Sequence, residues 1–186
     1  MQRRNFIQSL ALGAGLVSTS SGIGSDLSTS KTSERMKKLT TPVLIAGCGL
    51  GGVAAALALL RNGEKVILTE ETDWIGGQVT SQAVPPDEHA WIETHGAPKS
   101  YLKYRNKVRA FYFNNYPVAD AQRENKRFNP GNGSVSALCH EPKVSLAVLE
   151  QMLAPYISNG QLTLLLNHKS IASDVNDTIV RNVKFK

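Results

Sequence analysis

Residues 43–77 read VLIAGCGLGGVAAALALLRNGEKVILTEETDWIGG and decide the fold of this chain. An apolar run at 43–46 leads into the glycine-rich turn GCGLGG at 47–52, and an alanine- and leucine-rich stretch follows it. A second apolar run, 66–68, then ends close to Glu70. This order predicts a strand, a tight turn, a helix and a second strand with an acid at its tip, which is the unit that binds dinucleotides.

The glycines of the turn have separate expected roles. Gly47 permits the tight turn, Gly49 lets the backbone approach a pyrophosphate, and Gly52 lets the helix pack closely against the sheet. The pyrophosphate would bind unpaired N–H groups at the start of the helix, and Glu70 would accept hydrogen bonds from ribose hydroxyls. The cofactor contacts predicted in the turn are Gly47, Gly49, Leu50, Gly51 and Gly52. The alternative is a unit of the same shape that binds nothing, because glycines also cluster in ordinary turns.

The residues after Glu70 indicate which dinucleotide is bound. Five residues separate this acid from the pair Gly76-Gly77, a spacing that resembles the flavoprotein extension of the dinucleotide-binding motif. In that superfamily the glycine pair lies beside the cofactor pyrophosphate, so FAD is favoured over NAD. Glu70 would also repel the 2′-phosphate of NADP. The further predicted FAD contacts are Glu70, Glu71, Gly76, Gly77 and Gln78.

The first forty residues have a different composition. Arg3-Arg4 precede a mildly apolar stretch at 10–17 that is far too short to span a bilayer. This pattern resembles a twin-arginine (Tat) export signal, which implies the Tat machinery as a partner and a periplasmic or extracellular protein. We therefore expect a signal region at 1–30 and a linker at 31–41. The alternative is an N-terminal tail with two chance arginines.

Charge argues against a nucleic-acid partner. The chain carries a net charge of +6, but residues 1–42 hold six basic and two acidic side chains, so +4 of it falls in the signal and linker. The remaining 144 residues carry a net charge of only +2, so the basicity of the whole chain does not argue for a nucleic-acid partner. We also expect no stable membrane span, and two cysteines do not make a disulfide framework.

The last third of the chain reads as a helix followed by strands. Apolar residues from Val144 to Tyr156 recur at helical spacing, and Asn159-Gly160 would end that helix. Strands are expected at 162–166 and 178–185. In FAD-binding proteins of this type, the residues just after the first of these strands reach the adenine, which places Ile171 among the predicted cofactor contacts.

The middle of the chain predicts a second helix. Aromatic and aliphatic residues recur at helical spacing from Tyr101 to Tyr112, and Ser100 is the expected N-cap. Five basic residues accompany this stripe without an acid among them, and we interpret them as a solvated face: Lys99, Lys103, Arg105, Lys107 and Arg109. The alternative is a contact with an anionic group of the substrate or cofactor.

A catalytic residue is harder to find. Three potential ligands adjoin at Cys139-His140-Glu141, yet adjacent residues cannot all face one metal from a regular element, so no metal site is predicted. His140 is the weak candidate for a catalytic dyad or a substrate contact, because imidazole titrates near neutral pH.

A more specific resemblance covers residues 41–185. The segments GGQVTSQAVPPDEHAWIE, YRNKVRAFYFNNY, PGNGSVSALCHEP and LEQMLAPYISNGQLTLLL are similar to one bacterial group of FAD-dependent oxidoreductases. The resemblance implies an α/β, Rossmann-type (FAD/NAD-binding) three-layer domain at 42–186. We expect it to be the N-terminal part of a longer flavoprotein, incomplete in this chain.

The implied activity is flavin-mediated hydride or electron transfer from an unknown small organic molecule. Two alternatives stay open at this point: an NAD-dependent dehydrogenase, and a non-catalytic dinucleotide-binding fragment.

Overall fold

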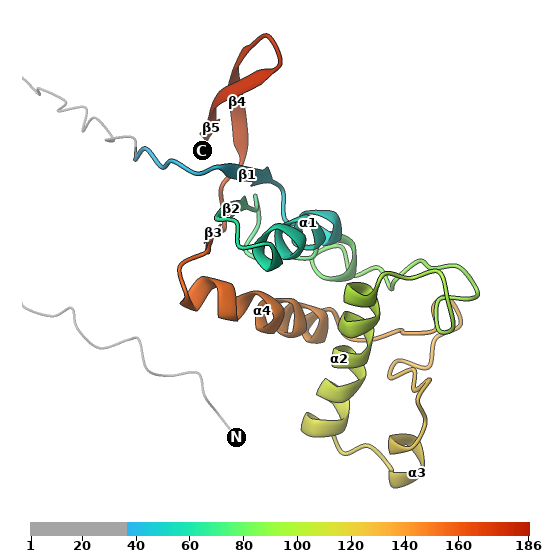
Figure 1. Cartoon of the computed structure of the whole chain (residues 1–186). Coiled ribbons are helices and arrows are strands. Elements are labelled where there is room, and N and C mark those ends of the chain that lie inside the picture. Colours follow the sequence, from blue (N-terminus) through green and yellow to red (C-terminus); the bar gives the residue numbers. More distant parts are fainter. Residues whose placement is uncertain (1–36) are drawn as a thin grey trace, which may run out of the picture. The chain divides into compact units, whose positions relative to one another are not determined.

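The computed structural model describes residues 37–186, so the expected signal region at 1–30 and most of the linker lie outside the described residues. The elements follow in the order β1 (Val43–Ala46), α1 (Leu50–Arg61), β2 (Val66–Thr69), the 3-10 helix η1 (Gly77–Val79), α2 (Lys99–Asn115), α3 (Asp120–Arg123), α4 (Pro142–Ser158), β3 (Leu162–Leu165), β4 (Ser170–Asn176) and β5 (Ile179–Phe185) (Figure 1). Within residues 37–186 no helix is both long enough and apolar enough to cross a membrane.

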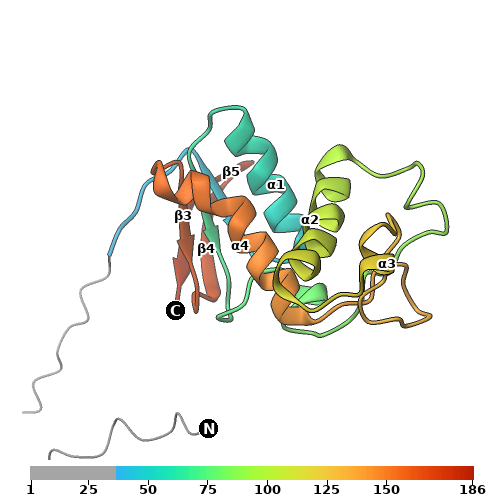
Figure 2. The ribbon, with the colours of Figure 1, turned by 90° about the horizontal axis from the view of Figure 1, so that it is seen from below.

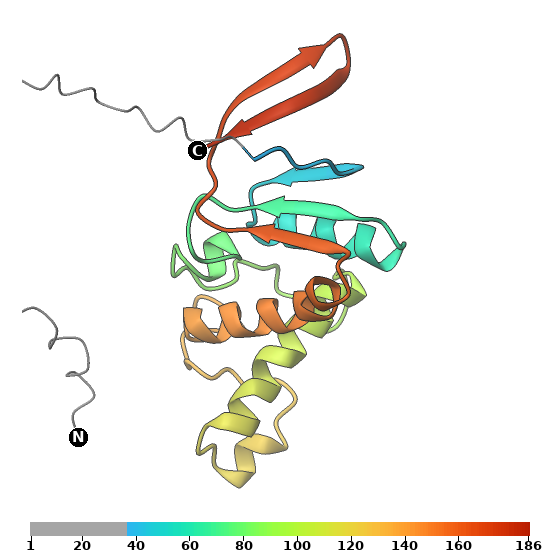
Figure 3. The ribbon, with the colours of Figure 1, turned by 90° about the vertical axis from the view of Figure 1, so that its left-hand side faces the viewer.

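Three of the strands form a parallel sheet in the order β1-β2-β3, and β4 and β5 form a separate antiparallel hairpin (Figure 3). The register is uniform: Ile45 lies opposite Leu68, and Leu68 lies opposite Leu164. Parallel neighbours need a crossover connection, and α1 and α4 supply the crossovers before β2 and β3. This is the mixed α/β, partly built Rossmann-type fold that the sequence predicts.

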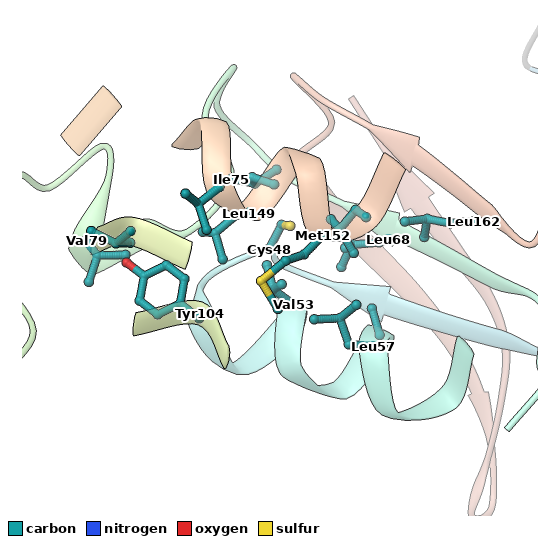
Figure 4. Packing of buried hydrophobic residues seen from close by; sticks show 14 of the residues in the cluster. Cys48, Val53, Leu57, Leu68, Ile75, Val79, Tyr104, Leu149, Met152 and Leu162 are labelled. Atoms are coloured by element: carbon teal, nitrogen blue, oxygen red, sulfur yellow. The ribbon is translucent and has the colours of Figure 1, made fainter. Parts of the chain in front are cut away.

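Helices α1 and α4 lie side by side over one face of the sheet (Figure 2). Strand residues alternate between the two faces, so Val66 and Leu68 of β2 point into the core under these helices. Figure 4 shows how Val53 and Leu57 of α1 meet Met152 of α4 within this core. Helix α2 packs on the first half of α4 and extends the core away from the sheet.

The predicted helix at 144–156 and the strand after it are confirmed. Helix α4 ends at Ser158, and Gly160 adopts the left-handed conformation (φ +75°) that stops it. The start of α2 differs from prediction: the N-cap is Pro98, in extended conformation, and Ser100 already lies inside the helix. The reason is that the carbonyl of Pro98 accepts hydrogen bonds from the N–H groups of Tyr101 and Leu102, at 2.9 and 3.2 Å.

Helix α1 approaches the backbone of the glycine turn very closely at Gly52. A Cβ atom at this position would lie 2.1 Å from the carbonyl oxygen of Gly47, whereas one at Gly51 would meet nothing within 4 Å. The backbone of Gly47 is itself held, because its N–H donates to the carbonyl of Thr69 at 3.0 Å. Only glycine therefore fits at Gly52.

We expect Gly52→Ala to lower the free energy of unfolding by about 2 kcal/mol or more, because the added methyl group must displace the Gly47 turn. Gly51→Ala is the matched control, and it should raise stability by a few tenths, up to about 1 kcal/mol, through helix propensity alone. Chemical denaturation of both variants measures the difference. Equal stability of the two would contradict this packing.

Candidate dinucleotide-binding site

The glycine turn leaves an open position at Gly49. Gly47 needs to be glycine for its own backbone, at φ +102°. Gly49 does not: its backbone is ordinary extended chain (φ −63°), and a Cβ placed there would meet no protein atom within 4 Å. Gly49 thus leaves free space in front of α1, and neither its backbone conformation nor a neighbouring protein atom requires a glycine there.

The start of α1 faces this gap with unpaired donors. The N–H of Val53 donates to the carbonyl of Gly49 at 3.0 Å, but in the described chain the N–H groups of Leu50, Gly51 and Gly52 make no hydrogen bond. No side chain caps this end of the helix, and its first turn holds no acid. Three free donors at the positive end of the helix dipole form a binding position for an anion.

The glycine pair lies beside the turn. The N–H of Gly76 donates to the carbonyl of Cys48 at 2.7 Å, and Gly49 and Gly76 form an isolated parallel bridge. A Cβ at Gly77 would lie 3.2 Å from the Cα of Gly49, and Gly76 itself has φ +105°. Gly76 is therefore required by its backbone conformation, and the absence of a side chain at Gly77 allows its close approach to Gly49.

Glu70 binds the turn from the other side. Its carboxylate accepts hydrogen bonds from the N–H of Cys48 at 3.0 Å, and from the N–H and hydroxyl of Thr72 at 3.1 and 3.0 Å. A carboxylate has about four acceptor sites, so one remains for a further donor such as a ribose hydroxyl. Burial, reinforced by the charge of Glu70, raises the pKa of the Cys48 thiol to about 12, so this cysteine is an unreactive filler of the turn.

The segment that enters β4 is tied to the same edge of the sheet. The N–H of His168 donates to the carbonyl of Glu70 at 2.8 Å, and Lys169 pairs with Glu71 at 3.3 Å on the surface. Ile171 follows within β4, at an irregularity in the pairing with β5, and its side chain is exposed. The Gln78 amide reaches the carbonyl of Pro85 at 3.5 Å. FAD contacts at Glu71, Gln78 and Ile171 stay predictions.

His140 belongs to a different group of side chains. Its Nδ1 lies 2.7 Å from the carbonyl of Leu138, so Nδ1 carries the proton and Nε2 accepts from the Ser145 hydroxyl at 2.5 Å. Ser145 in turn accepts from the Tyr104 hydroxyl, also at 2.5 Å. Burial lowers the pKa of His140 below its usual value, and Ser145 is fully buried. Tyr104 lies on α2 and Ser145 on α4, so these hydrogen bonds hold the two helices together. None of the partners comes from the glycine turn.

The interpretation of the basic run on α2 as a solvated face is wrong for two of its members. Arg105 and Arg109 are buried and pair with two acids of the preceding loop. Arg105 binds Glu88 and Glu93, and Arg109 binds Glu93 at 2.5 Å. The loop acids do not recur at a regular spacing, so this pairing could not be predicted from the sequence.

Within the part of the chain that the structure describes, no three His, Cys, Asp or Glu side chains gather closely enough to hold a metal ion.

Comparison with known proteins gives the site its context. The family described as "FAD dependent oxidoreductase" matches residues 42–186, which include every described element. The match confirms FAD, and not NAD, as the cofactor that the glycine pattern indicates, and it supports a flavin-dependent redox enzyme.

Individual relatives are distant and much longer. The FAD-dependent monooxygenase atnJ of Arthrinium sp is 37% identical over 54 residues, 29% of this chain and 13% of that protein. The FAD-dependent monooxygenase ntnJ of Nectria sp is 35% identical over 54 residues, with the same two shares. The carotenoid phi-ring synthase of Chlorobaculum tepidum is 29% identical over 122 residues, 57% of this chain and 19% of that protein. The chain spans less than a fifth of the length of these relatives.

The buried pairs make stability depend on pH. Burial alone would raise the pKa of Glu93, but hydrogen bonds from Arg109 and Arg105 outweigh it and hold that pKa below its ordinary value of 4.5. A carboxyl whose pKa is lower in the folded state stabilises the fold above the ordinary value, and this contribution is lost as pH falls through the folded-state pKa.

We therefore expect Glu93→Gln to lower the free energy of unfolding by about 3 kcal/mol at pH 7, because it leaves two buried guanidinium groups undercompensated. The deficit should shrink as pH falls below the ordinary carboxyl value, and it should vanish below the lowered folded-state pKa, where Glu93 of the wild type is protonated in the folded protein as well. Urea denaturation at a series of pH values measures this. Glu150→Gln, at an exposed residue of α4, is the control. A deficit that stays constant with pH would contradict the ion-pair account.

Proposed function

This chain belongs to the family of FAD dependent oxidoreductases, and on that premise we propose that its glycine turn, glycine pair and Glu70 hold the ADP half of FAD. The single observation that carries the proposal is the uncapped start of α1 in front of the open position at Gly49. A pyrophosphate supplies acceptor oxygens for the three free N–H groups, and its negative charge suits the positive end of the helix dipole. It also needs the close backbone approach that Gly49 allows.

The geometry fits the remainder of that half of the cofactor as well. Glu70 stands at the end of β2 with one acceptor position left for a ribose hydroxyl. The connection from β3 to β4 is bonded to the backbone of Glu70, so Ile171 and its neighbours follow directly from the ribose end. We propose that backbone groups near Ile171 bind the adenine.

The chemistry of the bound flavin is hydride or electron transfer, and we propose that the protein oxidises a small organic substrate. Two relatives are named as monooxygenases and one as a carotenoid ring synthase, so they do not point to one reaction. What these residues contribute is binding and orientation. No described side chain stands out as a catalytic base, because the one histidine singled out from the sequence, His140, is engaged with Ser145 and Leu138.

We also propose that the protein is exported by the Tat route to the periplasm or beyond. The support is the Arg3-Arg4 pair ahead of a short, weakly apolar stretch. Tat carries folded proteins, which suits an enzyme that must take up its flavin before it crosses the membrane.

Gly49→Val tests the cofactor site directly. The Cβ of the valine meets no protein atom within 4 Å, so the variant should fold with a melting temperature close to that of the wild type, but its side chain occupies the space next to α1 where the pyrophosphate would lie. We expect FAD affinity to fall by at least about a hundredfold, equal to about 2.7 kcal/mol. Titration of apoprotein by flavin fluorescence measures it. Ala58→Val, on exposed surface at the far end of α1, is the control. Wild-type affinity in the Gly49 variant would refute the site.

The export proposal has its own test. Replacing Arg3 and Arg4 by lysine keeps both charges but removes the guanidinium pair that the Tat receptor reads. A folded, flavin-loaded precursor should then accumulate in the cytoplasm, as fractionation and immunoblotting would show. Undiminished periplasmic protein from the lysine variant would show that the segment is not a Tat signal.

A further inference from the structure

One face of α2 is basic. Lys99, Lys103 and Lys107 follow one another at four-residue intervals and therefore share one face of the helix. Together with Leu102, Asn106 and Ala110, also on α2, they line a shallow, wide-open hollow of about 480 Å³. We call this surface the lysine groove.

The charge of the lysine groove is not neutralised within the described residues. No acid of the described chain lies within ion-pair distance of Lys99, Lys103 or Lys107, because Glu88 and Glu93 are bound to the arginines on the buried side of α2. The first turn of α2 also holds no acid, so Lys99 adds its charge to the positive end of the helix dipole. Lysines four residues apart repel each other as well. This face therefore favours an anionic occupant.

We propose that the lysine groove binds an acidic amphipathic helix of a partner protein. Residues four apart on a helix are separated by about 6 Å along its axis, so carboxylates at i, i+4 and i+8 match the three lysines. Leu102 is half-buried between the lysines and can cover one or two aliphatic side chains of the partner.

Other polyanions fit this surface less well. Single-stranded nucleic acid is bound by aromatic side chains on which its bases stack, together with arginines. Here Tyr104 and Tyr112 point into the core and the arginines of α2 are buried. An anionic membrane would need large exposed apolar side chains, and Leu102 is the only aliphatic residue of that size in the groove.

The test is binding of a synthetic probe to the purified flavin-loaded protein. The probe is a labelled helical peptide of about 20 residues with glutamates at i, i+4 and i+8 and leucines beside them. Fluorescence anisotropy should show saturable binding that weakens as salt rises from about 50 to about 300 mM. The triple variant Lys99→Glu, Lys103→Glu, Lys107→Glu should bind at least about tenfold more weakly. It should melt close to wild type, because it keeps like charges at the same four-residue spacing and places a glutamate at the positive end of the helix dipole.

Controls separate this proposal from general attraction to negative charge. A second triple variant, Lys65→Glu, Lys126→Glu, Lys143→Glu, makes the same change of charge at exposed lysines elsewhere and should bind the peptide within about twofold of wild type. A scrambled peptide, whose glutamates do not share a face, should bind weakly. Equal loss in both triple variants, equal binding of the scrambled peptide, or tighter binding of an oligonucleotide or of anionic vesicles would overturn the proposal. Flavin content should be the same in all variants, so the outcome is independent of the cofactor site.

Discussion

The N–H of Cys48 donates to the carboxylate of Glu70 at 3.0 Å, and the carbonyl of Cys48 accepts from the N–H of Gly76 at 2.7 Å. Through one residue the turn after β1, the end of β2 and the glycine pair are held together. These contacts keep the turn in the conformation that leaves the start of α1 uncapped and open. Both hydrogen bonds use the backbone of Cys48, and its thiol is buried in the core. The proposed cofactor site is therefore a consequence of how the backbone is tied.

The glycines of the site serve two different purposes. At Gly47, Gly52 and Gly76 the protein itself requires glycine, because of a positive φ or a contact that a Cβ would make impossible. At Gly49 neither reason applies. Nothing within the protein requires glycine at this position, which faces three free N–H groups of the helix. Such an arrangement suits an anion that binds close to the backbone. This difference separates folding residues from ligand residues within one short motif.

Sequence reasoning succeeded where the signal is local. Residues 43–77 predicted β1, the turn, α1 and β2, because spacing and glycine positions dictate these contacts. It also placed Gly76 and Gly77 beside the cofactor pyrophosphate, and in the structure this pair contacts the turn at Gly49. It failed for Arg105, which was expected in solvent, because burial of that guanidinium depends on Glu88 and Glu93 from a loop without periodicity. The partners of His140 were missed for the same reason. Tyr104 and Ser145 lie on two helices, and the way these helices pack cannot be predicted from the local sequence of either one.

Amide hydrogen exchange with and without FAD tests the central claim most directly, because it reports on the donors themselves. The N–H groups of Leu50, Gly51 and Gly52 lack partners in the described chain, so in apoprotein they should exchange within seconds. With FAD bound, peptides covering residues 47–53 should become strongly protected, and those covering 76–80 protected to a lesser degree. Unchanged exchange at 47–53 in protein that is saturated with FAD would contradict the account.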